Sequence, residues 1–339
     1  MALSARWKKL VAMFFASVAL AVGVAACGSS SSDSGSSSGG TRDATLILDF
    51  IPNAVHAGVY DALANGFYTD NGINLKIIQP TSTADTLKLI DAGKADFGIA
   101  DGIDLAGQID QGRGAQGIMA ILQRPAGGVI TLASDNITSP AELDGKTVGI
   151  TGVPSDTAIL NTIVSNAGGN PADVNAVTIG FNGVQALEGG KVSAFTGFVP
   201  ADGVQVENDG DQTKSFLLDE NGGPSYPGLV AFSTQDMIKS DPALMKGFVD
   251  ATIKGYQDAL ANPQKAIDDL VSQTQGVDKS LAMKQFEAYV PLFGPSTTYG
   301  QFNKKHLEEL STFLVKNNLV NSPIATSRYA DSSIASGGN

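Results

Sequence analysis

The sequence predicts an α/β protein with two similarly built lobes, each a mainly parallel sheet flanked by helices. Strand-like and helix-like segments alternate from Thr45 to Ala100 and again from Thr147 to Gly169. This succession favours parallel strands covered by helices on both faces of the sheet. The segment Ile90–Ala95 (IDAGKA) is echoed by Leu187–Val192 (LEGGKV), and two similar lobes would explain the echo. Chance is the alternative, because only two of the six residues are identical.

The first alternating set contains three expected strands and two expected helices. In the first helix Val55, Val59 and Leu63 recur every four residues, which is the spacing of one helical face. Gly66 and Gly93 stand where the two helices would stop. The expected strands are Thr45–Phe50, Ile73–Ile78 and Asp96–Ala100.

The second set begins with a strand at Thr147–Ile150 and continues with a helix from about Ser155 to Ala167. After about Pro227 the apolar spacing becomes mainly helical. The expected helices there are Asp241–Ala261, Pro263–Val271, Lys279–Ala288 and Asn303–Lys316. The last nine residues, 331–339, are expected to be disordered.

The N-terminus has the pattern of a secretion signal over residues 1–26. Arg6, Lys8 and Lys9 precede an uncharged apolar run of 17 residues, Leu10–Ala26. An uncleaved transmembrane anchor is the alternative, but a span requires about 20 apolar residues. The run ends in VAAC at residues 24–27, which resembles the lipobox of bacterial lipoproteins. That resemblance implies that Cys27 becomes the lipidated first residue and anchors the chain.

Residues 27–43 are predicted to form a flexible tether. Between Gly28 and Asp43 there are eight serines and four glycines, so this segment has almost nothing to bury. For such a coil the root-mean-square reach is about 20 Å. A globular body could therefore move above a membrane while staying close to it.

Composition excludes several classes of function. Loss of residues 1–26 would move the net charge from −12 to −15, because three basic and no acidic residues lie there. A nucleic-acid partner is therefore not expected. Cys27 is the only cysteine, and His56 and His306 are the only histidines. We expect no metal, no cofactor and no nucleophilic catalytic cluster, and a monomeric protein.

The segment Leu48–Tyr60 (LDFIPNAVHAGVY) resembles the opening signature of the thiamine-pyrimidine family of solute-binding proteins, in which LDWxPNxxHxGxY is typical. Gly93–Ala100 and Leu143–Gly149 resemble segments shared more widely with alkanesulfonate, taurine and nitrate binders. The resemblance extends over about Thr45 to Leu310. It implies a type II periplasmic-binding fold that encloses a small-molecule ligand between two lobes and delivers it to an ABC permease.

In the expected first lobe, candidate ligand contacts lie at or just beyond the carboxyl ends of strands, where ligands bind in open α/β sheets. Asp49, Phe50 and Asn53 lie at the carboxyl end of the first strand, and Asp101 follows the third. His56 and Tyr60 are four residues apart and share one helical face. The alternative for the last two is that Tyr60 packs in the core and His56 caps a turn.

In the expected second lobe, Pro154 and Ser155 begin a helix whose free N–H groups could donate to a ligand. Ser155 could equally be a simple helix cap. Asn182 and Phe198 follow other expected strands. The resemblance implies that Asp202 holds the amino groups of a pyrimidine.

The sequence departs from the family at two aromatic positions. Phe50 stands where the opening signature has tryptophan. The segment Phe198–Asp202 (FVPAD) is one residue shorter than the WNxE-like cluster of the pyrimidine binders and contains no tryptophan. The acidic group is retained but the stacking surface is changed, so a different flat heterocycle remains open.

Charge favours a neutral or amino-bearing ring over an anion. Asp49, Asp101 and Asp202 would all face the cleft, where an anionic ligand would meet like charges. An alkanesulfonate, taurine or nitrate binder is the alternative if Arg124 reaches the cleft. A ligand-sensing lipoprotein is another. The fungal pyrimidine synthases share the opening motif, but their hallmark is a cysteine-rich segment associated with iron, so we expect no enzyme here.

The expected domain organisation is discontinuous. Residues 44–131 and 229–330 are assigned to lobe 1, and residues 132–228 to lobe 2. The short apolar runs Val129–Ala133 and Leu229–Ser233 are the candidate crossings between the lobes. Hinge closure on the ligand is the expected mechanism, with the closed form recognised by the permease.

Overall fold

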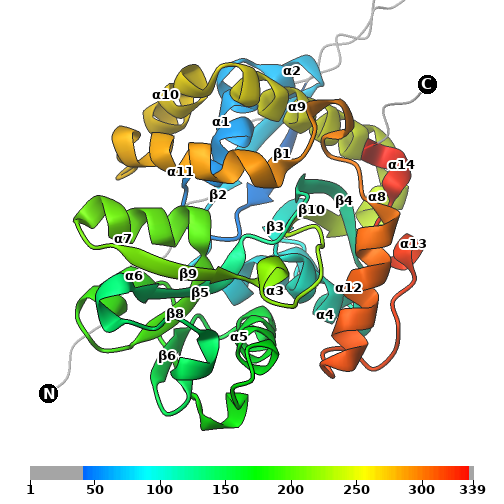
Figure 1. Cartoon of the computed structure of the whole chain (residues 1–339). Coiled ribbons are helices and arrows are strands. Elements are labelled where there is room, and N and C mark those ends of the chain that lie inside the picture. The colour runs from blue at the N-terminus through cyan, green and yellow to red at the C-terminus, as the bar shows by residue number, and fades with distance from the viewer. Residues whose placement is uncertain (1–40, 336–339) are drawn as a thin grey trace, which may run out of the picture. The chain divides into compact units, whose positions relative to one another are not determined.

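The protein contains two five-stranded sheets of closely similar topology (Figure 1). The computed structural model describes residues 41–335. The predicted signal segment, Cys27 and the tether up to residue 40 lie outside the described residues, as do residues 336–339. The first sheet has the order β2 (Ile73–Ile78), β1 (Arg42–Ile47), β3 (Phe97–Ala100), β10 (Leu229–Thr234) and β4 (Ala115–Leu122).

The second sheet repeats this pattern. Its order is β7 (Asn175–Thr178), β6 (Thr147–Ile150), β8 (Ala194–Phe198), β5 (Gly127–Leu132) and β9 (Thr213–Leu217). In each sheet the first three strands are parallel, and the fourth, β10 or β5, is antiparallel to both of its neighbours. The predicted α/β class and two-lobed periplasmic-binding fold are therefore confirmed.

The internal echo seen in the sequence corresponds to equivalent turns in the two sheets. One turn joins α3 (Thr83–Asp91) to β3 and the other joins α6 (Gly183–Glu188) to β8. Gly93 and Gly190 have left-handed φ angles of 63° and 64°. The amides of Lys94 and Lys191 donate to the carbonyls of Leu89 and Ala186 in the same relative positions. Glycine is required in both turns because other side chains rarely adopt this conformation.

Helices cover both faces of each sheet because successive strand residues point to opposite sides. In the second sheet Val129 packs with α5 (Pro154–Asn166), whereas Ile130 packs with α6 and α7 (Val204–Asp209). In the first sheet Leu46 packs on the side of α1 (Ala57–Ala64), α9 (Pro242–Ala261), α10 (Pro263–Gln273) and α11 (Lys279–Phe293). Ile47, on the opposite face, packs with α3, α4 (Gly102–Asp110) and α12 (Lys304–Lys316).

The long helix α9 approaches α1 at glycine contacts. A Cβ atom at Gly255 would lie 2.1 Å from the carbonyl oxygen of Gly58, so only glycine permits this approach. Tyr256 also lies against Gly58 and donates to the carbonyl of Val55 at 2.7 Å. The short helices α2 (Phe67–Asp70), α8 (Gln235–Ser240), α13 (Thr326–Tyr329) and α14 (Ser332–Ala335) complete the first lobe.

The chain passes between the sheets twice, at residues 123–126 and 218–228. Nε of Arg124 in the first passage donates to Asp219 in the second at 2.7 Å, so the two passages are joined. The segments 129–133 and 229–233, taken from the sequence as crossings, fall largely on β5 and β10. The assignment of residues to lobes at 131/132 and 228/229 remains a prediction.

Two segments expected to be unstructured are ordered. β1 begins at Arg42, two residues before the expected globular body, because Arg42 and Asp43 pair with Ile73 and Asn74 of β2. The expected disordered tail contains α14, whose residue Ala335 is buried against the first core. The apolar residues Ile334 and Ala335 explain this packing; residues 336–339 lie outside the described part of the chain.

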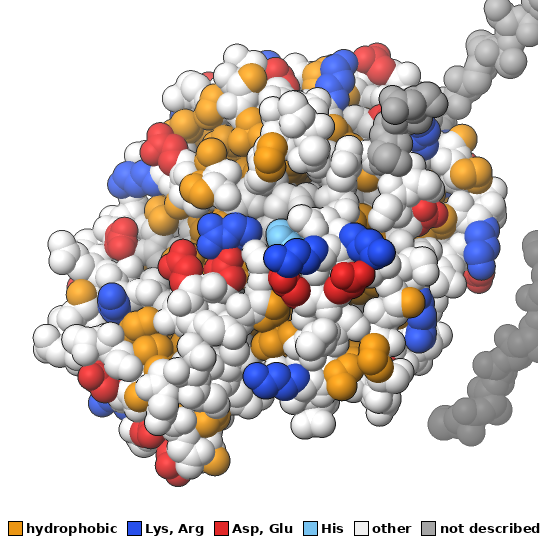
Figure 2. Space-filling model, turned by 45° about the vertical axis from the view of Figure 1, so that its right-hand side comes forward, with side chains coloured by type: hydrophobic (Ala, Val, Ile, Leu, Met, Phe, Trp, Pro, Cys, Tyr) orange, Lys and Arg blue, Asp and Glu red, His pale blue; other side chains and the backbone are white. Residues whose placement is uncertain are grey.

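Acidic and basic side chains are interspersed on the face shown in Figure 2. Charged side chains of the described residues also form pairs, such as Lys246 with Asp250 and Lys265 with Asp258 and Asp269. Exposed pairs of this kind contribute little to stability individually. Within residues 41–335, each helix is too short or too polar to span a lipid bilayer.

Candidate ligand-binding site

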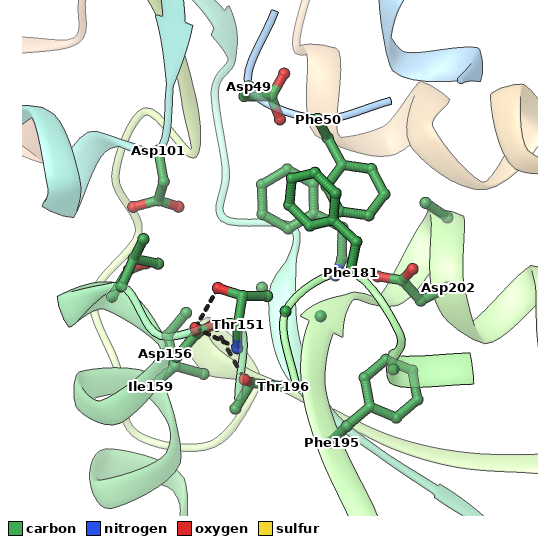
Figure 3. Close-up of a pocket in the computed structure, with 18 of the residues that line it drawn as sticks. Asp49, Phe50, Asp101, Thr151, Asp156, Ile159, Phe181, Phe195, Thr196 and Asp202 are labelled. Carbon is green, nitrogen blue, oxygen red and sulfur yellow. Dashed lines mark hydrogen bonds between the residues drawn. The ribbon is translucent and has the colours of Figure 1, made fainter. Parts of the chain in front are cut away.

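A cavity lies between the two sheets, where the carboxyl ends of β1, β3, β6, β7 and β8 meet (Figure 3). We call it the central cavity. It contains about 800 Å³ of empty space, including the part open to solvent. Both lobes contribute to its wall, which is the arrangement expected for a ligand site in open α/β sheets.

Five aspartates line the central cavity. Asp49, Asp101 and Asp104 come from the first lobe, and Asp156 and Asp202 from the second. Among residues 41–335, no lysine, arginine or histidine lines this cavity. In the same described range, no group of three or more histidine, cysteine, aspartate or glutamate residues is arranged to hold a metal ion. The cavity is therefore strongly acidic or, where carboxyls are protonated, rich in both donors and acceptors.

Burial raises the pKa of four of these carboxyls, because the closed site excludes the water that would stabilise their charged form. The pKa of Asp101 is well above its ordinary value, and the pKa of Asp156 is also raised. The pKa values of Asp104 and Asp202 are raised to about 7. For Asp101, Asp104 and Asp202 a neighbouring carboxylate adds to the effect of burial.

Asp49 is held by a short chain of hydrogen bonds. His56 lies in the 3-10 turn Ala54–His56, and its Nδ1 accepts from the amide of Asn53 at 3.2 Å. Nδ1 is therefore unprotonated in a neutral imidazole, and Nε2 carries the hydrogen that is donated to Oδ1 of Asp49 at 2.8 Å. His56 is fully buried. It therefore fixes the orientation of Asp49, which itself lines the cavity.

Asp101 caps α4 by accepting from the amide of Ile103 at 2.7 Å. It also accepts from the hydroxyl of Tyr226 at 3.0 Å, and Tyr226 belongs to the second passage between the sheets. Asp104, one turn farther along α4, bonds across the cleft to the second lobe. It accepts from the amide of Ser155 at 3.1 Å and from its hydroxyl at 2.7 Å. These bonds join the lobes in this structure.

Asp156 lies in the first turn of α5 and accepts four hydrogen bonds, of which Figure 3 shows those from Thr151 and Thr196. The donors are the amides of Thr151 and Gly152, at 2.8 and 3.1 Å, and the hydroxyls of Thr151 and Thr196, at 2.5 and 3.0 Å. Asp202 accepts only one, from the amide of Phe198 to Oδ2 at 2.8 Å. Its Oδ1 accepts none from the described residues.

Four phenylalanines provide the apolar part of the wall: Phe50, Phe181, Phe195 and Phe198. Phe50 follows β1 in the first lobe and Phe181 follows β7 in the second. Their ring centroids lie 4.2 Å apart with an interplanar angle of 63°. Figure 3 shows the rings of Phe50 and Phe181 near Asp49 and Asp202, on the other side of the cavity from Asp101 and Asp156. The cavity thus combines aromatic surface with carboxylates.

The structure brings seven of the eleven predicted ligand residues to the central cavity, namely Asp49, Phe50, Asn53, Asp101, Ser155, Phe198 and Asp202. His56 and Tyr60 are buried beneath the wall instead, where Tyr60 packs in the first core and burial raises its pKa to about 12. Asn182 donates to the carbonyl of Ile179 rather than lining the cavity. Pro154 is also absent from the wall, although Ser155 beside it is present.

Asp104, Thr151, Asp156, Phe181 and Thr196 line the cavity but were not among the predicted contacts. Some signals were available in the sequence. Thr151 directly follows a predicted strand, and Asp156 lies in the helix start that was selected for Ser155. Asp104 stands three residues after Asp101, which is close to one helical turn. Its bond to Ser155 joins residues 51 apart, and no local pattern indicates that contact.

A family model described as NMT1/THI5 like matches residues 53–266. The chain is 25% identical over 285 residues to the formylaminopyrimidine-binding protein of Halalkalibacterium halodurans, covering 82% of this chain and 86% of that protein. It is 27% identical over 251 residues to the 4-amino-5-hydroxymethyl-2-methylpyrimidine phosphate synthase of Legionella pneumophila, covering 74% and 79%.

The fold is also found among solved structures. The alkanesulfonate-binding protein SsuA of Xanthomonas axonopodis pv. citri, bound to MOPS, superposes with a TM-score of 0.69. The match covers 85% of this chain and 97% of that chain at 12% sequence identity. Identity this low supports the shared fold alone.

Proposed function

The chain belongs to the NMT1/THI5-like family, and from that premise we propose that it is a solute-binding protein for a small planar heterocycle bearing N–H groups. The ligand is a thiamine-precursor pyrimidine or a related vitamin-like compound. It binds in the central cavity and is passed to an ABC permease. The chain is exported and held by a lipid on Cys27 at the outer face of the cytoplasmic membrane, and it acts as a monomer without an enzymatic step.

One observation carries this proposal: the cavity combines five aspartates and four phenylalanines with no basic side chain among the described residues. An aminopyrimidine offers N–H donors to carboxylates, ring nitrogens to protonated carboxyls or hydroxyls, and flat faces to phenyl rings. The unpaired Oδ1 of Asp202 is the acceptor we assign to the exocyclic amino group. Asp49, oriented by His56, is assigned to a second N–H group.

An anionic ligand is disfavoured by the same arrangement. Arg124, the residue that could have supported a sulfonate or nitrate site, is paired with Asp219 at 2.7 Å and with Glu220 at 3.5 Å. It does not line the central cavity. A sulfonate would therefore meet carboxylates without a compensating cation, and uncompensated like charges in a closed site are costly.

Hinge closure is the mechanism we assign. The two passages joined by Arg124 and Asp219 are the flexible connections, and the bonds from Ser155 to Asp104 accompany the closed form. A ligand touching Asp49 in one lobe and Asp202 in the other favours closure because it binds that form better. The closed form is then recognised by the permease.

A synthase is the alternative that the names of several relatives raise. The cysteine-rich segment associated with iron in the fungal synthases has no counterpart here, because Cys27 is the only cysteine. If the protein were a synthase, prolonged incubation with its ligand would change the ligand chemically. Recovery of unaltered ligand, measured by mass spectrometry, supports binding alone.

The proposal is tested by thermal-shift screening of the purified full-length chain in mild detergent. The panel contains 4-amino-5-hydroxymethyl-2-methylpyrimidine, formylaminopyrimidine, riboflavin, alkanesulfonates and nitrate. A ligand that binds only the folded state raises the melting temperature. We expect a heterocycle to do so, with the shift lost in Asp202→Ala and His56→Ala. A response to sulfonates or nitrate alone would refute the assigned ligand class.

A further inference from the structure

A second cavity adjoins the central one, and we call it the outer cavity. Phe50, Asn53, Phe181, Ala201 and Asp202 line both. The remaining wall of the outer cavity comes from the loop after Phe50, from α6 and α7 in the second lobe, and from residues 276–285 at the start of α11. The two cavities therefore share a wall that contains the Phe50–Phe181 contact and the Asp202 carboxyl.

We propose that the outer cavity is a second subsite for the same ligand. The ligand then has two parts: a planar amino-bearing ring in the central cavity, and an uncharged extension rich in hydroxyl or amide groups in the outer one. This inference rests on the proposed function, because it extends the site assigned there. It defines the ligand class more narrowly than a bare aminopyrimidine.

The polar groups of the outer cavity suit such an extension. Three glutamines line it: Gln185 on α6, Gln205 on α7 and Gln285 on α11. Gln285 is only 6% exposed, and its Nε2 donates to the carbonyl of Ala201 at 3.0 Å. Its Oε1, and the whole side-chain amide of Gln185, have no hydrogen-bond partner among the described residues. Amides both donate and accept, as hydroxyl and amide groups of a ligand require.

Charge restricts the extension to uncharged groups. Among residues 41–335, no lysine, arginine or histidine lines the outer cavity, whereas Asp202 and Asp278 do. A phosphate or carboxylate there would face these carboxylates without a cation. Apolar surface is also present: Leu281 lines the cavity, as does Ile51, which is 46% exposed. A ligand chain covering Ile51 would remove this apolar surface from water.

The Phe50–Phe181 contact explains how the two subsites are divided. The rings come from different lobes, and their centroids are 4.2 Å apart. A ligand ring stacked between them would need about 7 Å, because each stacked pair is separated by about 3.5 Å. No ring therefore fits between them here. The pair separates a ring-sized central site from the outer cavity, and Asp202 is available to both parts of the ligand.

The test compares two ligands that share one ring. The first is 4-amino-5-hydroxymethyl-2-methylpyrimidine. The second is 4-amino-5-aminomethyl-2-methylpyrimidine acylated with gluconic acid, which adds an amide and a chain of hydroxyls. Isothermal titration calorimetry on the full-length chain in mild detergent measures both dissociation constants. We expect the extended ligand to bind at least tenfold more tightly.

Two variants localise the difference. Leu281→Trp fills the outer cavity and should weaken the extended ligand at least tenfold while changing the short ligand less than threefold. Gln185→Ala removes an amide at an exposed position and should weaken the extended ligand three- to tenfold. Val315→Trp, which adds the same ring at an exposed site on α12, is the control. Melting temperatures verify that each variant is folded.

The outcomes separate this inference from the proposed function. If the short ligand binds as well as the extended one, and neither cavity variant discriminates between them, the second subsite is refuted while the heterocycle site stands. If neither ligand binds the parent chain, the second subsite is refuted for an aminopyrimidine, and the proposed function fails only if every heterocycle of the thermal-shift panel also leaves the melting temperature unchanged. Selective loss of the extended ligand in Leu281→Trp and Gln185→Ala supports both.

Discussion

Asp156 and Asp202 belong to the same lobe and line the same cavity, yet they are held very differently. Asp156 accepts four hydrogen bonds from groups around the ends of β6 and β8, whereas Asp202 accepts one. Both carboxyls have raised pKa values because both are buried. The number of internal partners therefore distinguishes them: Asp156 joins parts of its own lobe, and Asp202 retains an oxygen for a ligand.

Asp156→Ala should give the largest effect, on stability. The substitution removes the acceptor of the amides of Thr151 and Gly152 and of the hydroxyls of Thr151 and Thr196. The Thr196 hydroxyl then keeps only the longer bond to the carbonyl of Gly149, at 3.4 Å. Buried groups that lose a partner destabilise by about 1–3 kcal/mol each, and losses within one network are not additive. We expect the free energy of unfolding to fall by about 3 kcal/mol, measured by urea denaturation.

Asp135→Ala, at an exposed position, is the matched control and should change stability by less than about 0.5 kcal/mol. If Asp156→Ala unfolds at the same urea concentration as the parent, Asp156 does not stabilise its own lobe. Asp156 would then have to be considered a ligand contact like Asp202.

Asp202→Asn should give the next largest effect, on ligand affinity. The amide can keep the hydrogen bond from Phe198 through its oxygen, but it then presents NH₂ rather than a carboxylate oxygen to the ligand amino group. Loss of a hydrogen bond to a charged acceptor corresponds to about 1.5–3 kcal/mol, or a 10- to 150-fold weaker dissociation constant. Calorimetry with the heterocycle that responds in the screen measures it.

If Asp202 acts on the ligand and Asp156 on stability, then Asp202→Asn must leave stability unchanged. Asp202→Asn should leave the urea midpoint within error of the parent or raise it, because a buried carboxyl with one partner is replaced by a neutral group. A large loss of stability together with unchanged affinity would exchange the roles assigned to Asp202 and Asp156.

A smaller effect is expected on the pH dependence of stability, and it tests the protonation of Asp202. Burial and a neighbouring carboxylate raise the pKa of Asp202 to about 7, against about 3.9 in an unfolded chain. At this carboxyl the folded protein therefore binds more protons than the unfolded chain between these values, so the contribution of Asp202 to stability is fully present at low pH and is lost as pH rises through 7. Asp202→Asn should reduce this fall by about 1 kcal/mol between pH 6 and 7.

Equilibrium unfolding in urea at pH 6 and pH 7, on the parent and on Asp202→Asn, measures this difference. Asp104 also has a pKa raised to about 7, so a residual fall is expected in the variant. Parallel pH profiles for the two proteins would contradict the raised pKa of Asp202.

Much of the fold was predictable because it depends on local patterns. The bounds of β2 and β6 agree with the prediction, since short β-branched runs flanked by polar or turn residues indicate strands. The echo at Gly93 and Gly190 was visible because both turns require a left-handed glycine. The sequence did not indicate that α14 is structured, because this helix is buried against β4 and α9, which are distant in sequence.

The candidate site was predictable only where a residue directly follows a strand or belongs to the family signature. Asp49, Asp101 and Asp202 satisfy one of these conditions. His56 was expected at the ligand but lies behind Asp49, since neither its position in the motif nor its spacing from Tyr60 specifies which way the ring points. Asp104 was missed because its partner Ser155 is supplied by the other lobe.

Ser155→Ala should give the smallest effect and extends the comparison to Asp104, whose hydrogen bonds cross between the lobes. The variant keeps the bond from the Ser155 amide and loses the one from its hydroxyl at 2.7 Å. One neutral donor contributes about 0.5–1.5 kcal/mol, and here it favours only the closed form. Ligand affinity should therefore fall about threefold, measured by calorimetry, while the urea midpoint of the ligand-free protein changes little.

Small-angle scattering of the ligand-free Ser155→Ala protein should show a larger radius of gyration than the parent, because fewer molecules are closed. Equal radii together with the threefold loss would instead mean that the hydroxyl contacts the ligand directly, and that Asp104 does not join the lobes during closure.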